Sequence, residues 1–171
     1  YTFYGYSFVP PTPFQLKDWE KYDVSRFVDV GAISPTEGYR TYPVRTNEIE
    51  YSTIQEDLQN LVKTNDLSKG IFLFHSPPYE TMLDRAALDG KLIDHVPLDV
   101  HVGSIAIKRF IQKHKPYVTL HGHVHESTQL TKQWKQKIGT TYSFQGAHNG
   151  KELSIIEFQL EFPQHAKRIL E

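Results

Sequence analysis

Histidines gather at two places in this sequence. Three alternate in HGHVH, at His121, His123 and His125, and another, His75, follows the apolar run GIFLF. Side chains two positions apart in an extended segment point the same way, so His123 and His125 can face one locus. A neutral imidazole nitrogen is a good ligand for zinc, manganese or iron. The two groups therefore predict a metal site formed by His75, His123 and His125.

A purely structural role is the competing interpretation, because most histidines in proteins are hydrogen-bonded core or surface residues and this chain has nine. The spacing and the position after an apolar run favour the metal site. His121 is expected to hydrogen-bond a ligand or a carbonyl group, and direct binding of the ion is the alternative. Gly122 is expected to bend the chain sharply beside whatever occupies the site.

Two strands must carry these histidines to a common place. The short apolar runs 70–74 and 117–120 are typical of buried strands, and each ends directly before a histidine. In an α/β sheet, ligands bind just beyond the carboxyl ends of the strands. We therefore expect His75 and the histidines of 121–125 to lie together at that edge.

The remaining elements indicate an α/β fold class. The pattern predicts strands over residues 2–9, 134–144 and 153–162, and helices over 53–62, 80–88 and 104–115. The first helix begins with a capping-box pattern at Thr53 and Glu56. Asn149 and Gly150 are a strong hairpin signal and are expected to join the last two strands. Most of residues 14–48 shows no regular pattern.

A second candidate site precedes the helix that begins near residue 104. Asp99 and His101 lie just before Gly103 and Ser104. The amino terminus of a helix attracts anions, so His101 and Ser104 are candidates for contacts to a substrate phosphate. The alternative is that Ser104 only caps the helix and that His101 is solvated.

The composition excludes several classes of function. A chain of 171 residues suits one domain with a real core, and its net charge of -1 gives no support to nucleic-acid binding through general basicity. Cysteine is absent, which excludes disulfides and thiolate metal sites and fits a reducing cytoplasm. No apolar run approaches the roughly 20 residues that span a bilayer, so a cytoplasmic protein without a membrane partner is expected.

Two of these segments resemble the last two metal-binding blocks of the calcineurin-like metallophosphoesterases. FLFHSPPY, with His75, is similar to the strand-end histidine block, and LHGHVHES, with Gly122, His123 and His125, is similar to the final G-H-x-H block. The likeness covers about residues 70–160. It implies a layered β-sandwich flanked by helices, in which residues 1–171 form the C-terminal part of a single domain that is incomplete at its N-terminal side.

The first three blocks of that family, D-x-H, G-D-x-x-D and G-N-H-D/E, are expected to be absent from this chain. By resemblance, a complete enzyme holds two ions of manganese, iron or zinc that share an aspartate and a water. His75 and His123 would bind one ion, and His125 the other. Because neutral imidazoles cannot offset the charge of two neighbouring divalent ions, this chain alone is expected to hold one ion or none. The histidine that protonates the leaving group would belong to the third block, upstream of Tyr1.

The resemblance implies a metal-dependent phosphatase that hydrolyses phosphomonoesters or phosphodiesters with a metal-activated water and is inactive without its other half. One alternative is a non-catalytic module that keeps the fold and some histidines. Another is a mononuclear zinc hydrolase with three histidine ligands. Because the strands at 71–74 and 117–120 expect neighbours on both sides, an isolated half is also expected to self-associate through exposed strands.

Overall fold

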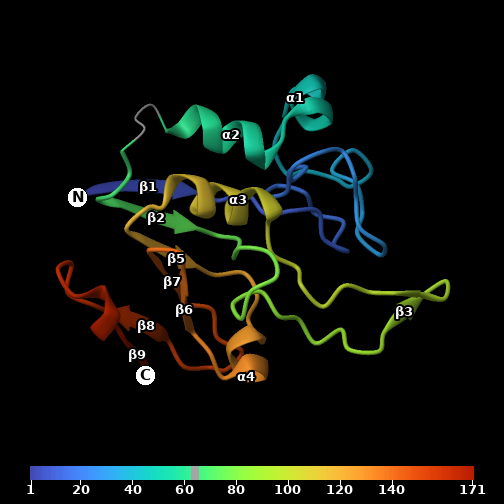
Figure 1. Cartoon of the computed structure of the whole chain (residues 1–171). Coiled ribbons are helices and arrows are strands. Elements are labelled where there is room, and N and C mark those ends of the chain that lie inside the picture. Colours follow the sequence, from blue (N-terminus) through green and yellow to red (C-terminus); the bar gives the residue numbers. More distant parts are fainter. Residues whose placement is uncertain (63–65) are drawn as a thin grey trace.

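One mixed five-stranded sheet organises the molecule. The computed structural model describes residues 1–62 and 66–171, and it places the strands of this sheet in the order β1-β2-β5-β7-β6 (Figure 1). Their bounds are β1 Thr2–Tyr6, β2 Gly70–Phe74, β5 Val118–His121, β6 Lys135–Ile138 and β7 Thr141–Gln145. β1, β2, β5 and β7 are parallel, so their carboxyl ends meet at one edge, whereas β6 runs antiparallel to β7. The α/β class predicted from the sequence is confirmed.

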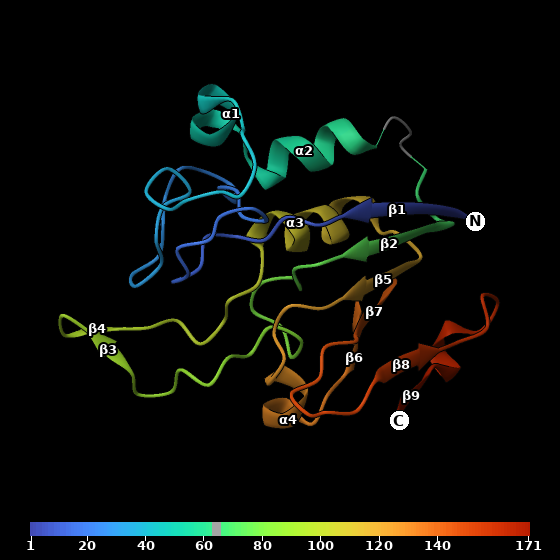
Figure 2. The ribbon, with the colours of Figure 1, turned by 180° about the vertical axis from the view of Figure 1, so that it is seen from behind.

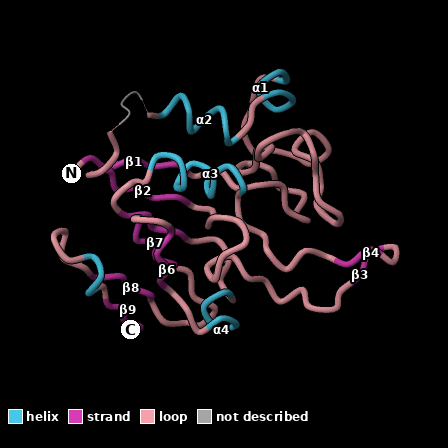
Figure 3. Tube along the Cα trace, in the orientation of Figure 1, coloured by secondary structure: helices cyan, strands magenta, loops and turns pink. Residues whose placement is uncertain are grey.

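Two helices cover one face of this sheet (Figures 1 and 3). The described residues contain α1 (Thr46–Tyr51), α2 (Ile54–Leu61), α3 (Ile105–His114), α4 (Ser127–Thr131) and a 3-10 helix (Pro163–His165). α2 and α3 share an apolar core with Phe72 and Phe74 of β2, to which they contribute Leu58, Phe110 and Ile111. Over the described ranges, none of the helices combines the length and the apolar character needed to cross a bilayer.

Side-chain caps explain where the two long helices begin. The hydroxyl of Thr53 accepts a hydrogen bond from the backbone N–H of Glu56 at 3.1 Å, and the Glu56 carboxylate accepts one from the N–H of Thr53 at 3.2 Å. The hydroxyl of Ser104 accepts from the N–H of Ile107 at 3.0 Å, and α3 ends at Lys115 in the left-handed conformation. Both predicted starts are confirmed, since caps are interactions between near neighbours in the chain.

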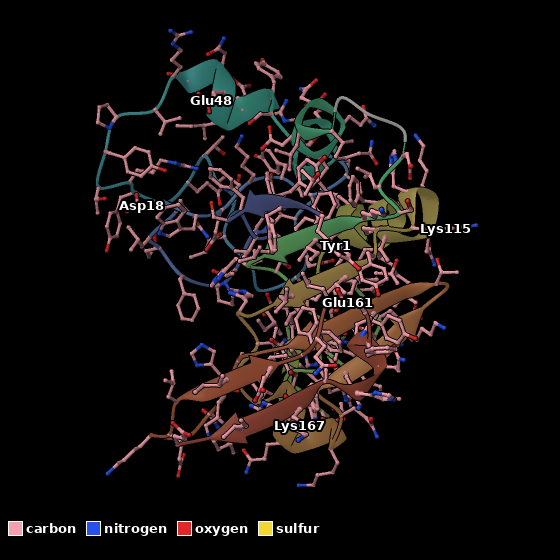
Figure 4. The ribbon with its side chains drawn as sticks, turned by 90° about the vertical axis from the view of Figure 1, so that its left-hand side faces the viewer. Tyr1, Asp18, Glu48, Lys115, Glu161 and Lys167 are labelled. Atoms are coloured by element: carbon pink, nitrogen blue, oxygen red, sulfur yellow. The ribbon has the colours of Figure 1, made fainter. Side chains whose placement is uncertain are left out.

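A second, two-stranded sheet covers part of the opposite face of the large sheet (Figure 2). Its strands are β8 (Ser154–Glu157) and β9 (Lys167–Leu170), which run antiparallel. Ile71, Val118, Phe144 and Ala166 form the buried core of this layer. In Figure 4, Lys167 marks β9 below the large sheet.

The two-stranded sheet leaves the face over β1 and the end of β2 uncovered. Phe3 is 63% exposed and Leu73 is 51% exposed, whereas Ile71, on the same face of β2, is fully buried. A Cβ added to Gly5, which pairs with Leu73, would meet no heavy atom within 4 Å in the described chain. An apolar part of the sheet beside the strand ends is therefore open to a further layer.

The C-terminal strands differ from the prediction. Residues 134–144 form the hairpin β6–β7 rather than one strand, because Gly139 turns the chain at a positive φ of 59°. Asn149 and Gly150 do not join a hairpin, since β7 belongs to the large sheet and β8 pairs with β9. The strand predicted over 153–162 ends at Glu157. These predictions are wrong because strand pairing depends on partners far along the chain.

The segment that follows β2 also differs from the prediction. The helix predicted over 80–88 is absent, because the buried carboxylate of Asp84 accepts hydrogen bonds from the N–H groups of Glu80, Thr81 and Gly103 at 2.8, 2.8 and 3.1 Å. Two short strands, β3 (Leu92–Ile93) and β4 (Val96–Pro97), then form a hairpin that projects from the body (Figure 2). Neither this hairpin nor α1 was indicated by the sequence pattern.

The strands expected to lack neighbours have them. β2 lies between β1 and β5, and β5 lies between β2 and β7. The edges of the large sheet fall on β1 and β6 instead. Self-association stays a prediction, but missing neighbours of β2 and β5 are not a reason for it.

Candidate metal centre

His75 and His123 lie next to each other at the carboxyl edge of the sheet. They follow the adjacent parallel strands β2 and β5, in which Leu73 pairs with Leu120. The backbone N–H of Gly122 donates to the carbonyl of His75 at 3.0 Å and joins the two strand ends. The ring centroids of His75 and His123 are 5.1 Å apart, and the ring planes are inclined by 61°. The fold thus brings together two histidines from distant parts of the chain.

This separation fits two ligands of one ion. Two imidazoles bound to a tetrahedral zinc ion, with bonds of about 2.0–2.1 Å, have ring centroids about 5 Å apart. Within residues 1–62 and 66–171, no group of three or more histidine, aspartate or glutamate side chains is arranged to hold a metal ion. The centre therefore offers two close ligands, and an ion held here would need further ligands from water or from another polypeptide.

The two histidines favour the neutral form that a metal ion requires. Burial, followed by the charges of His75 and His125, lowers the pKa of His123 to about 4. His75 is an exposed residue whose ring is partly enclosed, and this partial burial, followed by the charge of His125, also lowers its pKa. His125 is exposed and acts on both rings electrostatically, although it does not complete a three-ligand group. At neutral pH, His75 and His123 therefore carry imidazole lone pairs that can bind a cation.

The bend that places His123 falls on this residue itself. Its φ is 69°, in the left-handed region, whereas Gly122 is not among the glycines with a positive φ. A Cβ on Gly122 would lie 3.7 and 3.8 Å from the carbonyl oxygen and Nδ1 of His75, which are ordinary contact distances. The prediction that Gly122 supplies the bend is therefore wrong. A non-glycine residue in the left-handed region costs about 1–2 kcal/mol, and such strain is typical of functional sites.

His121 points into the protein instead of toward the other two rings. It is buried, and its ring stacks on Phe74 with centroids 5.7 Å apart. Its Nδ1 lies 2.9 Å from the carbonyl oxygen of Ser76, and its Nε2 lies 2.8 Å from Oγ1 of Thr119. Burial lowers the pKa of His121 to about 4. With both ring nitrogens engaged, His121 has none left for an ion, which removes the alternative of direct ligation.

The amino terminus of α3 is already occupied by a carboxylate of this chain. Oδ1 of Asp23 accepts from the hydroxyl of Ser104 at 2.5 Å, and Oδ2 accepts from the N–H of Ile105 at 2.7 Å. Burial raises the pKa of Asp23, and the hydrogen bonds from Ser104, Ile105 and Ala106 oppose that shift. The phosphate contact predicted for Ser104 is therefore not supported by the geometry. Ser104 caps α3 and donates its hydroxyl proton to Asp23.

His101 lies against another carboxylate, that of the fully buried Asp84. Its Nδ1 lies 2.9 Å from Oδ1 of Asp84, and its backbone N–H donates to Asp99 at 2.8 Å. Asp99 also accepts from the hydroxyl of Tyr79 at 2.6 Å. Asp99, Val100 and His101 match the pattern D-x-H, so the expectation that this block is absent from the chain is wrong. The two side chains do not form a ligand pair, because the Asp99 carboxylate bonds Tyr79 and the His101 ring bonds Asp84. No sequence pattern indicates the roles of Asp23 and Asp84, since only the folded chain brings their carboxylates to these backbone N–H groups.

Comparisons with known proteins find one relative that matches part of the chain and no matching family model. No family model matches the sequence. Uncharacterized protein MJ1162 of Methanocaldococcus jannaschii is 34% identical over 126 residues, which cover 71% of this chain and 48% of that protein. The chain thus spans about half the length of the curated relative it matches. A solved crystal structure is similar at a TM-score of 0.41 and 21% identity, over 68% of this chain and 36% of that chain, and a likeness this weak carries no argument.

Proposed function

We propose that this chain carries half of a two-metal phosphoesterase centre, and that the intact centre hydrolyses phosphomonoesters or phosphodiesters. The observation that carries the proposal is the pair of neutral histidines, His75 and His123, side by side beyond adjacent parallel strands. Their order in FLFHSPPY and LHGHVHES is that of the last two ligand blocks in calcineurin-like metallophosphoesterases. Geometry and sequence resemblance support the same centre.

The residues of the pair can do one part of this chemistry. A divalent ion bound here would polarise a phosphoester oxygen and lower the pKa of a bound water. His75 and His123 contribute two neutral nitrogen donors, which is a suitable set for zinc, manganese or iron. His125 extends the set toward a second ion in this proposal. Neutral donors leave the charge of the ions uncompensated, so the intact centre needs carboxylates as well.

The open face of the large sheet is where we expect those carboxylates to arrive. His75 directly follows β2 and is two residues after Leu73, so alternation along an extended segment would place both side chains on the same side of the sheet. That face is uncovered at Phe3, Gly5 and Leu73. A further sheet layer packed there would complete a β-sandwich and bring its strand ends beside His75. The match to the M. jannaschii relative covers only 48% of that protein, which leaves chain length for such a layer.

Two other functions have less support. A mononuclear zinc hydrolase needs His75, His123 and His125 in one ligand set, and the described residues contain no group of three ligands. A non-catalytic module needs no metal ion. Metal binding by this chain therefore separates the proposed function from the second alternative.

Titration with zinc and manganese tests the proposal. Isothermal titration calorimetry should find about one ion per chain, the number that two close histidines and water ligands can hold. His75→Ala and His123→Ala should each weaken binding by more than the roughly 10–100-fold that loss of an outer partner costs. His165→Ala is the matched control, because His165 is an exposed histidine whose ring stacks on Phe162. No binding by the wild type, or an equal loss in the control, overturns the proposal.

Activity gives a second test. With zinc or manganese, the 171-residue chain should not hydrolyse p-nitrophenyl phosphate or its bis-ester above the buffer rate. The reason is that no carboxylate joins His75 and His123 in a group of three metal ligands among the described residues. Hydrolysis by this chain that disappears in His123→Ala would show that the centre is complete without another half.

A further inference from the structure

A row of buried polar groups leads from the interior of the sheet to the end of β2. Oγ of Ser143 on β7 lies 2.8 Å from Oγ1 of Thr119 on β5, which lies 2.8 Å from Nε2 of His121. Nδ1 of His121 then lies 2.9 Å from the carbonyl oxygen of Ser76. All four residues are buried. We refer to Ser143, Thr119 and His121, together with the Ser76 carbonyl, as the His121 relay.

The acceptor at one end fixes every proton in the relay. A carbonyl oxygen can only accept, so Nδ1 of His121 must carry a hydrogen. No carboxylate of the described residues contacts the ring, and a buried imidazolium without such a partner is costly, so the ring is neutral and has a single N–H. Nε2 is then an acceptor, and the hydroxyl of Thr119 must donate to it. The heavy-atom angles favour Thr119 as the donor to Ser143. Because the single hydroxyl hydrogen of Thr119 goes to Nε2, the Ser143 hydroxyl must turn and donate to Thr119 instead.

We infer that the His121 relay positions His75 opposite His123, so that Thr119 and Ser143 are positioning residues of the metal centre. The part of this inference that concerns metal rests on the proposed function. The relay holds the carbonyl of Ser76, the residue after His75, while the N–H of Gly122 holds the carbonyl of His75 itself at 3.0 Å. Both bonds connect the end of β2 to the end of β5.

The hydrogen bonds to the carbonyls of His75 and Ser76 hold the ring of His75 close to the ring of His123. His75 is exposed, and it belongs to a segment that leaves the sheet at Phe74. Without the His121 bond, the Ser76 peptide would be attached to β5 only through the preceding residue, and the ring of His75 could turn away from His123. Partners that orient a metal ligand are commonly worth about 10–100-fold in metal affinity. An apolar core contact would support His121 through its shape alone. The relay also depends on which group donates each hydrogen bond, so a substitution that keeps the shape but removes the donor should still disturb His75.

The tautomer of His121 tests the relay without any metal. Nitrogen NMR of the imidazole ring in the metal-free wild type should show hydrogen on Nδ1 and a hydrogen-bonded, unprotonated Nε2. Thr119→Val keeps the shape of the side chain and removes the hydroxyl, so the Nε2 shift should move toward that of a nitrogen without a donor. Thr119→Ser restores the hydroxyl and should restore the shift. An Nε2–H tautomer in the wild type overturns the relay.

Zinc affinity tests positioning. Thr119→Val and Ser143→Ala should weaken zinc binding by about 3- to 100-fold, and Thr119→Ser should recover most of the loss in Thr119→Val. Thr141→Val is the control, because Thr141 is a buried threonine on the same face of β7 that donates to the carbonyl of Pro116 at 2.6 Å, outside the relay. It should bind zinc as the wild type does.

The two readouts separate two kinds of failure. If Thr119→Val shifts the Nε2 signal but binds zinc like the wild type, the positioning role is wrong while the proposed function stands. If Thr141→Val weakens binding as much as Thr119→Val, the effect is general core damage and the positioning role is again wrong. If the wild type binds no zinc, the proposed function fails, and the tautomer alone decides whether the relay exists.

Discussion

At the scale of single residues, the histidines of one short segment play different parts. The pKa values of His121 and His123 are both lowered to about 4, and burial is the chief cause in each case. Their hydrogen bonds separate them, because both ring nitrogens of His121 are engaged with Ser76 and Thr119. His123 instead faces the ring of His75. Burial makes both imidazoles neutral, and only His123, whose ring nitrogens have no hydrogen bond to the residues that the structure describes, is available to a cation.

The lowered pKa of His121 predicts a loss of stability in acid. The unfolded chain binds a proton at the ordinary pKa of 6.5, whereas the folded chain resists it down to about 4. The stabilisation is therefore fully present above pH 6.5 and is lost as the pH falls toward 4, by up to roughly 3 kcal/mol for a buried ring at about 1.4 kcal/mol per pKa unit. Urea denaturation between pH 7 and 4.5 should show this slope, and His121→Gln should reduce it. An unchanged slope in His121→Gln, or an equal reduction in His165→Gln, would contradict the prediction.

The positive φ of His123 predicts that glycine and alanine at this position differ in stability but not in zinc binding. Glycine adopts this conformation without strain, so His123→Gly should be more stable than His123→Ala by about 1 kcal/mol in the absence of metal. Both variants should lose zinc binding equally, since neither has an imidazole. Thermal or urea denaturation gives the comparison. Equal stability of the two variants would mean that the left-handed backbone is not present in solution.

At the scale of elements, α3 depends on a residue far away in the sequence. Asp23 accepts hydrogen bonds from Ser104 and from the N–H of Ile105, and it fills the place at the amino terminus of α3 that an external anion would take. The loop that carries Asp23 is therefore held to the helix, which in turn packs on β2 beneath the histidines. This contact makes the first part of the chain a structural support of the centre.

Removing this contact should destabilise the protein measurably. Asp23→Ala should lower the free energy of unfolding by about 2 kcal/mol, because it leaves the Ser104 hydroxyl and the partly buried N–H of Ile105 without their acceptor and removes a charge from the helix terminus. Asp89→Ala is the comparison. Asp89 pairs with Arg85 on the surface, and its loss should cost about 0.5 kcal/mol or less. A cost for Asp23→Ala no larger than for Asp89→Ala, in urea denaturation, would refute the role of the cap.

At the scale of the whole molecule, the large sheet is covered unevenly. Helices pack on one face, and the layer of β8 and β9 packs on part of the other. The uncovered part includes Phe3 and Leu73, and His75 follows the end of β2 two residues after Leu73. The uncovered part of the sheet and the two close histidines lie at the same edge. In the proposed function, one further layer packs on that part and supplies the remaining ligands.

Two residues on the same face of β2 test this description. Ile71→Ala should cost about 2–5 kcal/mol, because Ile71 is fully buried beneath the two-stranded sheet. Leu73→Ala should cost about 1 kcal/mol or less, since Leu73 is 51% exposed. Urea denaturation at several protein concentrations is the measurement. A cost for Leu73→Ala that rises with concentration would show that copies of the chain cover this face, and it would revive the prediction of self-association on a different basis.

The sequence alone determined the features that depend on near neighbours. The capping residues Thr53 and Ser104 started α2 and α3, and the apolar run before His75 gave β2. Parallel strands that end in histidines then had to meet at one edge, so the approach of His75 to the 121–125 segment was also predictable. The pairing of the C-terminal strands was not, because β7 and β8 chose partners in different sheets.

The tertiary structure decided which side chains were buried and what they met. It turned His121 inward onto Ser76 and Thr119, and it placed the acid residues Asp23 and Asp84 beneath backbone N–H groups. No local sequence pattern identifies such residues. A carboxylate or imidazole is expected to be exposed, and only contacts with distant parts of the chain exclude water from it. Local sequence determines where a residue lies on a strand or helix. Contacts with residues distant in sequence determine its partner, its pKa and therefore its chemistry.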